Sequence, residues 1–263
     1  MKILICEGAT DMEFLTKLLM KCYSFRQNNV DRLYIEKIGL DPYKYRKFHV
    51  VERDDEIFVF FPLGGGYENI MKTLKTKSQI IDWIRRGVSK IGCALDLDDK
   101  SAENLIDSVK QRLSTKYGDV REDGNYTLKV TIDRSNFYVT IIPLGDLNIS
   151  EKISELVGKD LKFRKHKIED LLIYLVIQDD SYRRIMTQAI DFYLEKKSIL
   201  YGKIDFIDQK SIIKMLESLC RYPDYGIYEL IIEVFSRIEN IKNLLPQYLT
   251  DSLEEFLNYQ QHR

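Results

Sequence analysis

The sequence predicts an α/β fold in which a mainly parallel sheet is flanked by helices and followed by a helical C-terminal domain. In the first half of the chain, short apolar runs that read as buried strands alternate with segments of helical periodicity. After Pro143, apolar residues recur mainly at helical spacing. Because strands that alternate with helices are typical of parallel sheets, we expect a layered α/β domain ahead of the helical part.

The first strand and the first helix are expected at the N-terminus. Ile3–Cys6 is an apolar run that ends at Glu7 and Gly8, and apolar residues then recur at helical spacing. Thr10 starts a Thr-x-x-Glu pattern, which is typical of a capping box. We therefore expect Thr10 as the N-cap and Asp11 in the first helical turn.

The remaining elements of the α/β part follow from the same two periodicities. Further strands are expected at Leu33–Ile38, Phe48–Glu52, Ile57–Phe61 and Ile91–Leu95, and as a hairpin of Tyr126–Ile132 and Phe137–Ile142. Helices are expected at Tyr67–Arg86, with a break near Thr76–Ser78, and at Ala102–Lys116. Because Ile57–Phe61 is continuously hydrophobic, we expect both of its faces to be covered.

The C-terminal part is expected to contain six helical segments. These are Ile149–Val157, Ile168–Ile177, Tyr182–Lys197, Lys210–Arg221, Ile227–Ile238 and Asp251–Tyr259. A short polar break at Gln178–Ser181 separates two of them. We therefore divide the chain into an α/β domain over residues 1–180 and a helical domain over residues 181–263.

Composition and charge exclude several classes of protein. The 263 residues carry 40 Lys and Arg against 41 Asp and Glu, so a nucleic acid would have to be bound by a local basic patch. Apolar runs are far shorter than the roughly 18 to 20 residues that span a bilayer, so no membrane partner is expected. The N-terminal apolar run is also too brief for a secretion signal, and we expect a cytoplasmic location.

Cysteine and histidine give no metal or nucleophile motif. The four cysteines are widely spaced, without a C-x-x-C pair or neighbouring histidines, which argues against a zinc site. Cys6 and Cys93 stand in apolar runs and are expected as buried thiols. No histidine is linked by a motif to a Ser or Cys nucleophile.

Acidic residues cluster where strands pass into turns or helices. The three clusters are Glu7 with Asp11, Asp96 with Asp98 and Asp99, and Glu169 with Asp170. Because ligands of open parallel sheets bind outside the carboxyl ends of the strands, Glu7 and Asp96 should face one crevice. Asp11, Glu169 and Asp170 also have a simpler interpretation, since acids are favoured in the first turn of a helix.

The Asp96-Leu97-Asp98 segment has the chemistry of a magnesium site. In an extended chain, residues two apart face the same side, so both carboxylates would point together while Leu97 turns to the core. Mg²⁺ usually takes only one or two protein carboxylates along with waters and phosphate oxygens. A pair of aspartates therefore suffices, although the same pattern is common in ordinary solvated loops.

Two of these motifs together resemble the TOPRIM domain. Its signature is a Glu after the first strand, here Glu7 in E-G-x-x-D, and an Asp-x-Asp after a later strand, here Asp96 and Asp98. The family comprises the catalytic domains of type IA and type II topoisomerases, bacterial-type primases, ribosomal-RNA maturases and "overcoming lysogenization defect" nucleases. The Glu169-Asp170 pair is similar to a further acidic motif of the nuclease branch, which extends the resemblance to about residue 177.

The resemblance implies a TOPRIM-like, Rossmann-like fold and a Mg²⁺-dependent nuclease that hydrolyses phosphodiesters in DNA or RNA, in DNA repair or RNA processing. Asp96 and Asp98 would bind Mg²⁺, with Mn²⁺ as an alternative ion. Glu7 would act as general acid/base or as a further ligand. Asp11, Glu169 and Asp170 would complete a second metal site, and two cations would clamp the attacking and leaving oxygens.

Two segments could hold nucleic-acid phosphates. Gly64-Gly65-Gly66 lies between an expected strand and helix, so its backbone N–H groups could cradle a phosphate, although a tight turn is the simpler interpretation. It is not a Walker loop, and Asn69 replaces the last glycine of a G-x-G-x-x-G pattern. A basic run precedes Glu169 and consists of Lys162, Arg164, Lys165, His166 and Lys167. Such runs contact phosphate backbones but are more often solvated surface.

Two other functions stay open at this point. The chain could be a non-catalytic binding or regulatory protein of the TOPRIM fold whose C-terminal helices contact a protein partner. It could also be a nucleotidyl transferase of the primase type, for which a nucleotide groove and a template channel would be needed. Metal binding distinguishes the first alternative from a nuclease, and product analysis with nucleotides supplied distinguishes the second.

Overall fold

The computed structural model describes residues 1–28, 31–40, 47–163, 165–201, 208–219, 221 and 223–258. The chain forms two compact units. The sheet unit contains Met1–Asp96, Lys100–Leu144 and Gln247–Arg263, and the helical unit contains Leu97–Asp99 and Gly145–Pro246. Arg164, which the sequence placed in the basic run, lies outside the described residues.

This division differs from the expected boundary at residue 180. Residues after 144 already pack with the later helices, because α6 (Ile149–Val157) and α7 (Ile168–Val176) contact α8 (Asp180–Tyr201) and α9 (Gln209–Glu217) respectively. The last helix, α11 (Gln247–Asn258), instead contacts strands of the sheet. The polar break at Gln178–Ser181 only separates α7 from α8 and does not end a domain.

The sheet has eight strands in the described residues, in the order β2-β3-β4-β1-β5-β8-β7-β6. They are β1 (Lys2–Cys6), β2 (Arg26–Asn28), β3 (His49–Arg53), β4 (Glu56–Pro62), β5 (Lys90–Asp96), β6 (Val120–Glu122), β7 (Thr127–Ile132) and β8 (Ser135–Leu144). The four central strands β4, β1, β5 and β8 are parallel, and the outer strands pair antiparallel. The expected mixed α/β architecture with a central parallel sheet is therefore confirmed.

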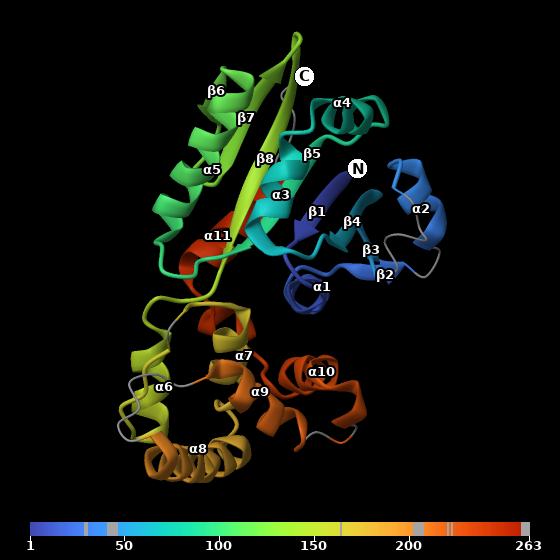
Figure 1. The fold of residues 1–263 in the computed structure, drawn as a ribbon. Coiled ribbons are helices and arrows are strands. Elements are labelled where there is room, and N and C mark those ends of the chain that lie inside the picture. The colour runs from blue at the N-terminus through green and yellow to red at the C-terminus, as the bar shows by residue number, and fades with distance from the viewer. Residues whose placement is uncertain are drawn as a thin grey trace. The chain divides into compact units, whose positions relative to one another are not determined.

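Helices cover both faces of the sheet. The helices of this unit are α1 (Ala9–Cys22), α2 (Asp31–Lys37), α3 (Gly66–Leu74), α4 (Lys77–Arg85), α5 (Ala102–Tyr117) and α11. Figure 1 shows α3 and α11 on opposite faces. On β4, Phe58 packs edge-on against Phe256 of α11, whereas Phe61 packs against Trp83 of α4. Because residues three apart on a strand face opposite sides, β4 is covered on both faces, as its hydrophobicity predicts.

Two buried lysines of the sheet donate hydrogen bonds to the C-terminal end of α11. Lys2 of β1 and Lys90 of β5 are register partners, and each side chain is about 2% exposed or less. Lys2 Nζ donates to the carbonyl of Leu257 at 2.6 Å, and Lys90 Nζ donates to that of Glu255 at 2.6 Å. These carbonyls belong to the last turn of α11, where cations are favourable. Burial lowers the pKa of Lys90 to about 7.

In its described residues, the helical unit consists of α6 to α10, with α10 at Ile227–Arg237, and of two short 3-10 helices at Pro223–Tyr225 and Ile241–Leu244. Tyr182 of α8 donates a hydrogen bond to Glu233 of α10, and Arg237 pairs with Asp179 at 3.1 Å. The apolar periodicity located each α-helix of this unit to within four residues at either end. Among the described helices, none is long and apolar enough to cross a membrane.

Three elements differ from the sequence expectation. The predicted strand at Leu33–Ile38 is wrong, because these residues lie in and just after helix α2. A helix buries Ile35 and Ile38, which are three apart, and leaves Leu33 66% exposed, whereas a strand would bury Leu33 beside Ile35. The short edge strands β2 and β6 were not predicted, since three largely polar residues carry no alternation signal.

Candidate active site

The carboxyl ends of three parallel strands meet at one edge of the sheet unit. Cys6, the last residue of β1, is in register with Pro62 at the end of β4 and with Ala94 near the end of β5. Glu7 follows Cys6 directly, and Asp96 ends β5. The two acids that the sequence placed after neighbouring strands therefore emerge at the same edge.

Glu7 is held against Asp96 by a hydrogen bond. The backbone N–H of Asp96 donates to Glu7 Oε1 at 3.1 Å. On the β4 side, the N–H of Gly64 donates to the Glu7 carbonyl at 3.1 Å. Both carboxylates are partly buried. Backbone contacts from two neighbouring strands thus fix Glu7 at the sheet edge with its side chain on the β5 side.

The triple glycine forms the turn between β4 and α3. Gly64, Gly65 and Gly66 all have φ between 66° and 69°, a conformation that side-chain-bearing residues rarely adopt. A Cβ on Gly66 would stand 3.3 Å from Glu7 Oε2, so the glycine leaves room for this carboxylate. Asn69 Nδ2 donates to the Gly64 carbonyl at 2.9 Å and closes the turn. Asn69, which breaks the dinucleotide motif, therefore has a structural role.

Asp11 serves as a helix cap. Helix α1 begins at Ala9 with Gly8 as N-cap, and the N–H of Gly8 donates to Asp11 Oδ2 at 2.7 Å. The expectation of Thr10 as N-cap is therefore wrong, because Thr10 lies inside the first turn. Glu13, the expected capping partner of Thr10, instead contacts His49 Nε2 at 3.2 Å. Asp11 is buried, with 5% exposure.

Asp98 does not continue the extended conformation of β5. The strand ends at Asp96, and Asp98 has φ of 53° in the left-handed region. Asp98 therefore does not have the extended conformation that was expected to point the Asp96 and Asp98 carboxylates to one side. Leu97 is fully buried, as expected. Asp96 and Asp98 remain two residues apart, so their Cα atoms are at most about 7 Å from one another.

Within the helical unit, Asp98 lies against the basic run. Asp98 and His166 exchange two backbone hydrogen bonds of 2.8 and 2.9 Å. The Asp98 carboxylate contacts Lys165 Nζ at 3.2 Å and Lys167 Nζ at 3.6 Å. Lys162 is exposed. Two lysines that the sequence assigned to phosphate thus already neutralise an acid that it assigned to metal.

Asp170 repeats the role of Asp11. It stands in the third position of α7, and its Oδ2 accepts the N–H of the N-cap residue Lys167 at 3.2 Å. Asp170 is fully buried, and the half-buried Glu169 precedes it in the same turn. The capping geometry supports the simpler interpretation of this acidic pair as a first helical turn.

Sequence reasoning missed one titratable residue near the basic run, Asp146, and gave no role to the imidazole of His166 within that run. Asp146 follows β8 after Gly145, is 4% exposed, and is paired with Lys152 of α6. His166 Nδ1 lies 3.7 Å from Asp170 Oδ2. Burial lowers the pKa of His166, although the negative charge of Asp146 opposes this effect. The signal was available, since Leu144-Gly145-Asp146 is an apolar strand end with a glycine and an acid, like Cys6-Glu7-Gly8.

The structure therefore brings together some of the expected site residues. Glu7 meets Asp96 in the sheet unit, and Asp98 meets Lys165 and Lys167 in the helical unit. Among the described residues, no three His, Cys, Asp or Glu side chains are close enough to hold a metal ion.

Thiol chemistry is not available to this edge. Burial raises the pKa of the Cys6 and Cys93 thiols, which excludes them as thiolate nucleophiles at neutral pH. Both are free cysteines, as is Cys22.

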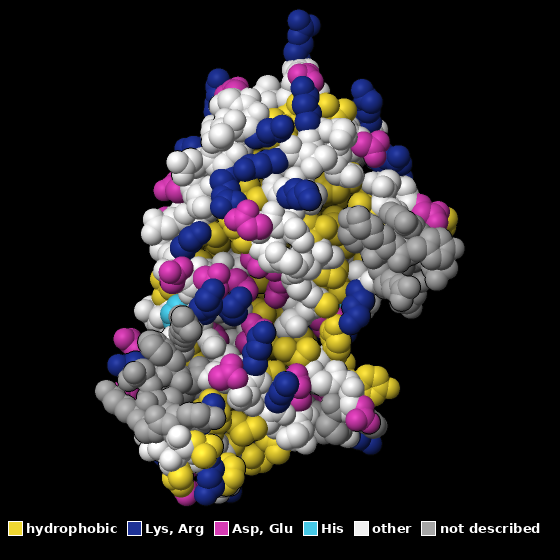
Figure 2. Space-filling model, in the orientation of Figure 1, with side chains coloured by type: hydrophobic (Ala, Val, Ile, Leu, Met, Phe, Trp, Pro, Cys, Tyr) yellow, Lys and Arg dark blue, Asp and Glu magenta, His cyan; other side chains and the backbone are white. Residues whose placement is uncertain are grey.

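On the face drawn in Figure 2, Lys and Arg side chains are interspersed with Asp and Glu side chains. Positive and negative side chains are therefore mixed on that face.

Two comparisons with known proteins give significant matches. A family model described as "Protein of unknown function (DUF3226)" matches residues 1–258. The chain is also similar to the crystal structure of the hypothetical protein PH0156 from Pyrococcus horikoshii OT3, at 20% identity and a TM-score of 0.64. That likeness covers 97% of this chain and 96% of the other, and it shows a shared fold. A comparison with curated proteins gave no significant match.

Proposed function

We propose that this chain, which belongs to the DUF3226 family of proteins of unknown function, is a TOPRIM-like, Mg²⁺-dependent phosphodiesterase that cleaves nucleic acid. The observation that carries the proposal is the hydrogen bond from the Asp96 N–H to Glu7 Oε1. It fixes a glutamate from the first strand beside an aspartate from the neighbouring strand. Both lie at the edge where open parallel sheets bind their ligands.

The strand arrangement supports the assignment. In the order β4-β1-β5-β8, both Glu7 and Asp96 follow central parallel strands, and β1 lies beside β5. Helix α3 begins at the same edge, directly after the glycine turn. The N–H groups of a helix start favour an anion, so this end of α3 could receive a substrate phosphate.

Asp96 and Asp98 would hold the Mg²⁺ ion, and their donor chemistry fits it. Both offer hard carboxylate oxygens, and the small number of protein ligands matches an ion that retains waters. When bound, the ion would neutralise phosphate charge and lower the pKa of a coordinated water. Asp98 would have to exchange its contacts with Lys165 and Lys167 for the cation, and the freed ammonium groups could then contact substrate phosphates.

Glu7 would act as the general acid/base of the reaction. Its Oε1 is engaged by the backbone of Asp96, while its Oε2 faces the glycine turn next to Gly66. A carboxylate whose one oxygen is anchored presents the other in a fixed direction. This is the arrangement required of a positioned general acid/base.

A second candidate function has a specific observation in its favour. Asp11 and Asp170 serve as helix caps, and Asp98 is paired with two lysines. Each of these acids has a structural role without any metal. A non-catalytic binding protein that retains the fold would show the same contacts, and metal-dependent cleavage distinguishes the two functions.

The experiment combines metal titration with cleavage assays. Mg²⁺ and Mn²⁺ are titrated calorimetrically into the wild type and into the double variant Asp96→Ala, Asp98→Ala. The same proteins are incubated with labelled plasmid, single-stranded DNA and RNA, with either metal or EDTA. Nucleoside triphosphates are added in a parallel series, in which product extension instead of cleavage would indicate nucleotidyl transfer.

The matched control is the double variant Glu151→Ala, Glu155→Ala. It removes the same charge from exposed positions on α6. We expect metal-dependent cleavage by the wild type and the control, and its loss in the Asp96, Asp98 variant. Equal weak metal binding by all three proteins without cleavage would refute the proposal and favour the non-catalytic function.

A further inference from the structure

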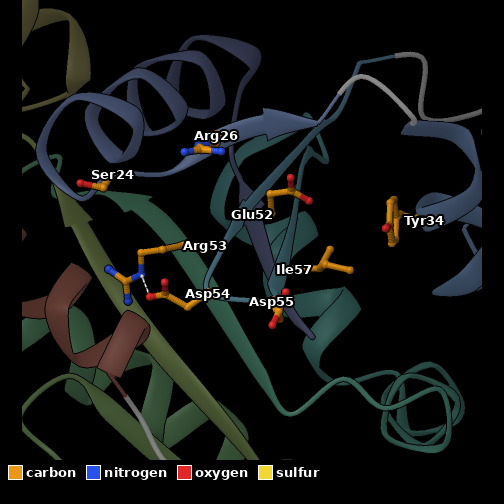
Figure 3. A pocket seen from close by; sticks show the side chains of 8 residues that line it. All are labelled: Ser24, Arg26, Tyr34, Glu52, Arg53, Asp54, Asp55 and Ile57. Atoms are coloured by element: carbon orange, nitrogen blue, oxygen red, sulfur yellow. Dashed lines mark ion pairs between the residues drawn. The ribbon is translucent and has the colours of Figure 1, made fainter.

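We infer that the sheet unit contains a second binding site, for a zwitterionic α-amino acid with an apolar side chain. A cavity of about 700 Å³ lies beside the edge strand β2 and its neighbours β3 and β4. Figure 3 shows side chains from these strands and from α2 around it. Its volume falls in the range of about 300–1,000 Å³ that small-molecule sites occupy.

The cavity is separate from the candidate active site. It is lined by Asp54 and Asp55, the two residues of the turn that precedes β4, whereas the glycine turn follows the other end of β4. A strand of this length separates its ends by on the order of 20 Å. The inference therefore does not depend on the proposed nuclease function.

A cation, an anion and an apolar side chain form a row along the cavity. Arg26 of β2 is in register with Glu52 of β3, which is in register with Ile57 of β4. Residues directly opposite one another on neighbouring strands face the same side, at a strand spacing of about 4.8 Å. In Figure 3, Tyr34 of α2 follows Ile57 at the end of this row away from Arg26.

Arg26 and Glu52 retain binding capacity. Among the described residues Arg26 forms no ion pair, whereas Arg53 contacts Asp54 at 3.5 Å and lies over the Phe25 ring at 4.8 Å. Glu52 accepts a hydrogen bond from Asn28 through Oε2 at 2.9 Å, and within the described part of the chain no donor contacts its Oε1. The cavity thus offers a fork for a carboxylate beside an acceptor for an ammonium group.

The ligand class follows from this order of charges. A carboxylate and an ammonium group joined to one carbon would meet Arg26 and Glu52, and the apolar side chain would extend over Ile57 towards Tyr34. The described residues that line the cavity provide three carboxylates, Glu52, Asp54 and Asp55, against two guanidinium groups. This excess of negative charge disfavours nucleotides and other polyphosphates.

Calorimetric titration of L-phenylalanine into the full-length protein tests the inference. We expect Arg26→Gln and Glu52→Gln each to weaken binding about tenfold, because each removes a charged hydrogen-bond partner. Arg26→Gln should not affect phenethylamine, which lacks the carboxylate, and Glu52→Gln should not affect hydrocinnamate, which lacks the amine. Arg121→Gln is the control, since Arg121 lies on the opposite edge strand β6 and is 77% exposed.

Wild-type measurements keep the test decisive if a variant fails to fold. With the unaltered protein, phenethylamine and hydrocinnamate should each bind more weakly than L-phenylalanine. The inference is overturned if L-phenylalanine and L-leucine show no binding in the millimolar range. It is also overturned if folded Arg26→Gln and Glu52→Gln retain wild-type affinity, or if adenosine monophosphate binds more tightly than L-phenylalanine. Loss of cleavage activity alone would bear only on the proposed function.

Discussion

The acidic residues of the sheet unit and of the helical unit differ in their hydrogen-bond and ion-pair partners. In both, an aspartate in the third position of a helix accepts the N–H of the N-cap residue, Asp11 in α1 and Asp170 in α7. In the helical unit Asp98 also contacts two lysines, and Asp146 contacts Lys152. In the sheet unit, Glu7 instead accepts the N–H of Asp96 on the neighbouring strand.

That difference indicates which acids the fold itself requires. A capping carboxylate stabilises its helix, so its presence needs no further function. A glutamate that ends an apolar strand contributes little to packing and faces a glycine that leaves it space. On our proposal, Glu7 is the acid that acts in the reaction, and the following predictions test this contrast.

The largest expected effect is on the pH dependence of stability, which should differ between the units. Lys90 has a folded pKa of about 7 against an ordinary value of 10.5, so between these values the unfolded chain binds more protons. Stability of the sheet unit should then rise with pH from about 7 to 10, by up to about 1.4 kcal/mol per pH unit. Lys90→Met should flatten this rise, as measured by urea unfolding followed through Trp83 fluorescence.

In the helical unit, stability should depend on pH over a lower pH range than in the sheet unit. Burial holds the pKa of His166 below 6.5, so between its folded and unfolded pKa values the unfolded chain again binds more protons. This unit should lose stability as pH falls below about 6.5, and His166→Asn should reduce that loss. A single transition with the same pH dependence in both variants would show that these two groups do not set the stability of their units.

Gly66→Ala should impair cleavage about tenfold or more, because the new Cβ would stand 3.3 Å from Glu7 Oε2 and displace it. Gly64→Ala is the matched control, since Gly64 has nearly the same φ but no atom within 4 Å of the point where a Cβ would stand. Both variants should lose about 1 kcal/mol of stability. If the two variants cleaved nucleic acid equally well, the position of the Glu7 carboxylate would have no effect on the reaction, which would contradict its proposed role.

Removing either cap should affect stability and spare chemistry. Asp11→Ala and Asp170→Ala should each lower the free energy of unfolding by about 0.5–2 kcal/mol, and Asn at either position should restore most of it. Urea unfolding measures the loss, and cleavage by the folded Asn variants measures the chemistry. A metal ligand at Asp11 or Asp170 would reverse this pattern, with stability kept and activity lost.

The smallest effect concerns the lysines that contact Asp98. The double variant Lys165→Met, Lys167→Met should raise Mg²⁺ affinity about two- to fivefold, because partly exposed ion pairs compete only weakly with the metal. Lys162→Met serves as the control. Calorimetry would contradict the role of Asp98 if the double variant bound Mg²⁺ no more tightly than the control.

The sequence predicted much of the fold, because apolar periodicity reports burial directly. Strands β1, β4 and β5 and helices α6 and α7 lie within one or two residues of their predicted positions. The prediction of Glu7 and Asp96 at one edge followed from the rule that ligands of open parallel sheets bind outside the carboxyl ends of the strands. Helix α2 was missed because Leu33 and Ile35 alternate as in a strand, whereas Ile35 and Ile38 have helical spacing, and the exposure of Leu33 distinguishes the two.

The details of the site depended on information that is not local in sequence. The left-handed conformation of Asp98 is associated with its backbone pairing to His166, which lies 68 residues further on. Likewise, the pairing of Asp98 with the basic run could not be inferred from either segment alone. The cap of α1 shifted from Thr10 to Gly8 because Asp11 reaches the earlier N–H.

The most direct test of the account compares two acids that are four residues apart in the sheet unit. Single-turnover cleavage of a labelled nucleic acid in Mg²⁺ is measured for the wild type, Glu7→Gln and Asp11→Asn. The account predicts a loss of about 100-fold or more for Glu7→Gln and nearly unchanged cleavage for Asp11→Asn, because only Glu7 handles a proton. Equal losses in both variants, or a Glu7→Gln protein as active as the wild type, would contradict it.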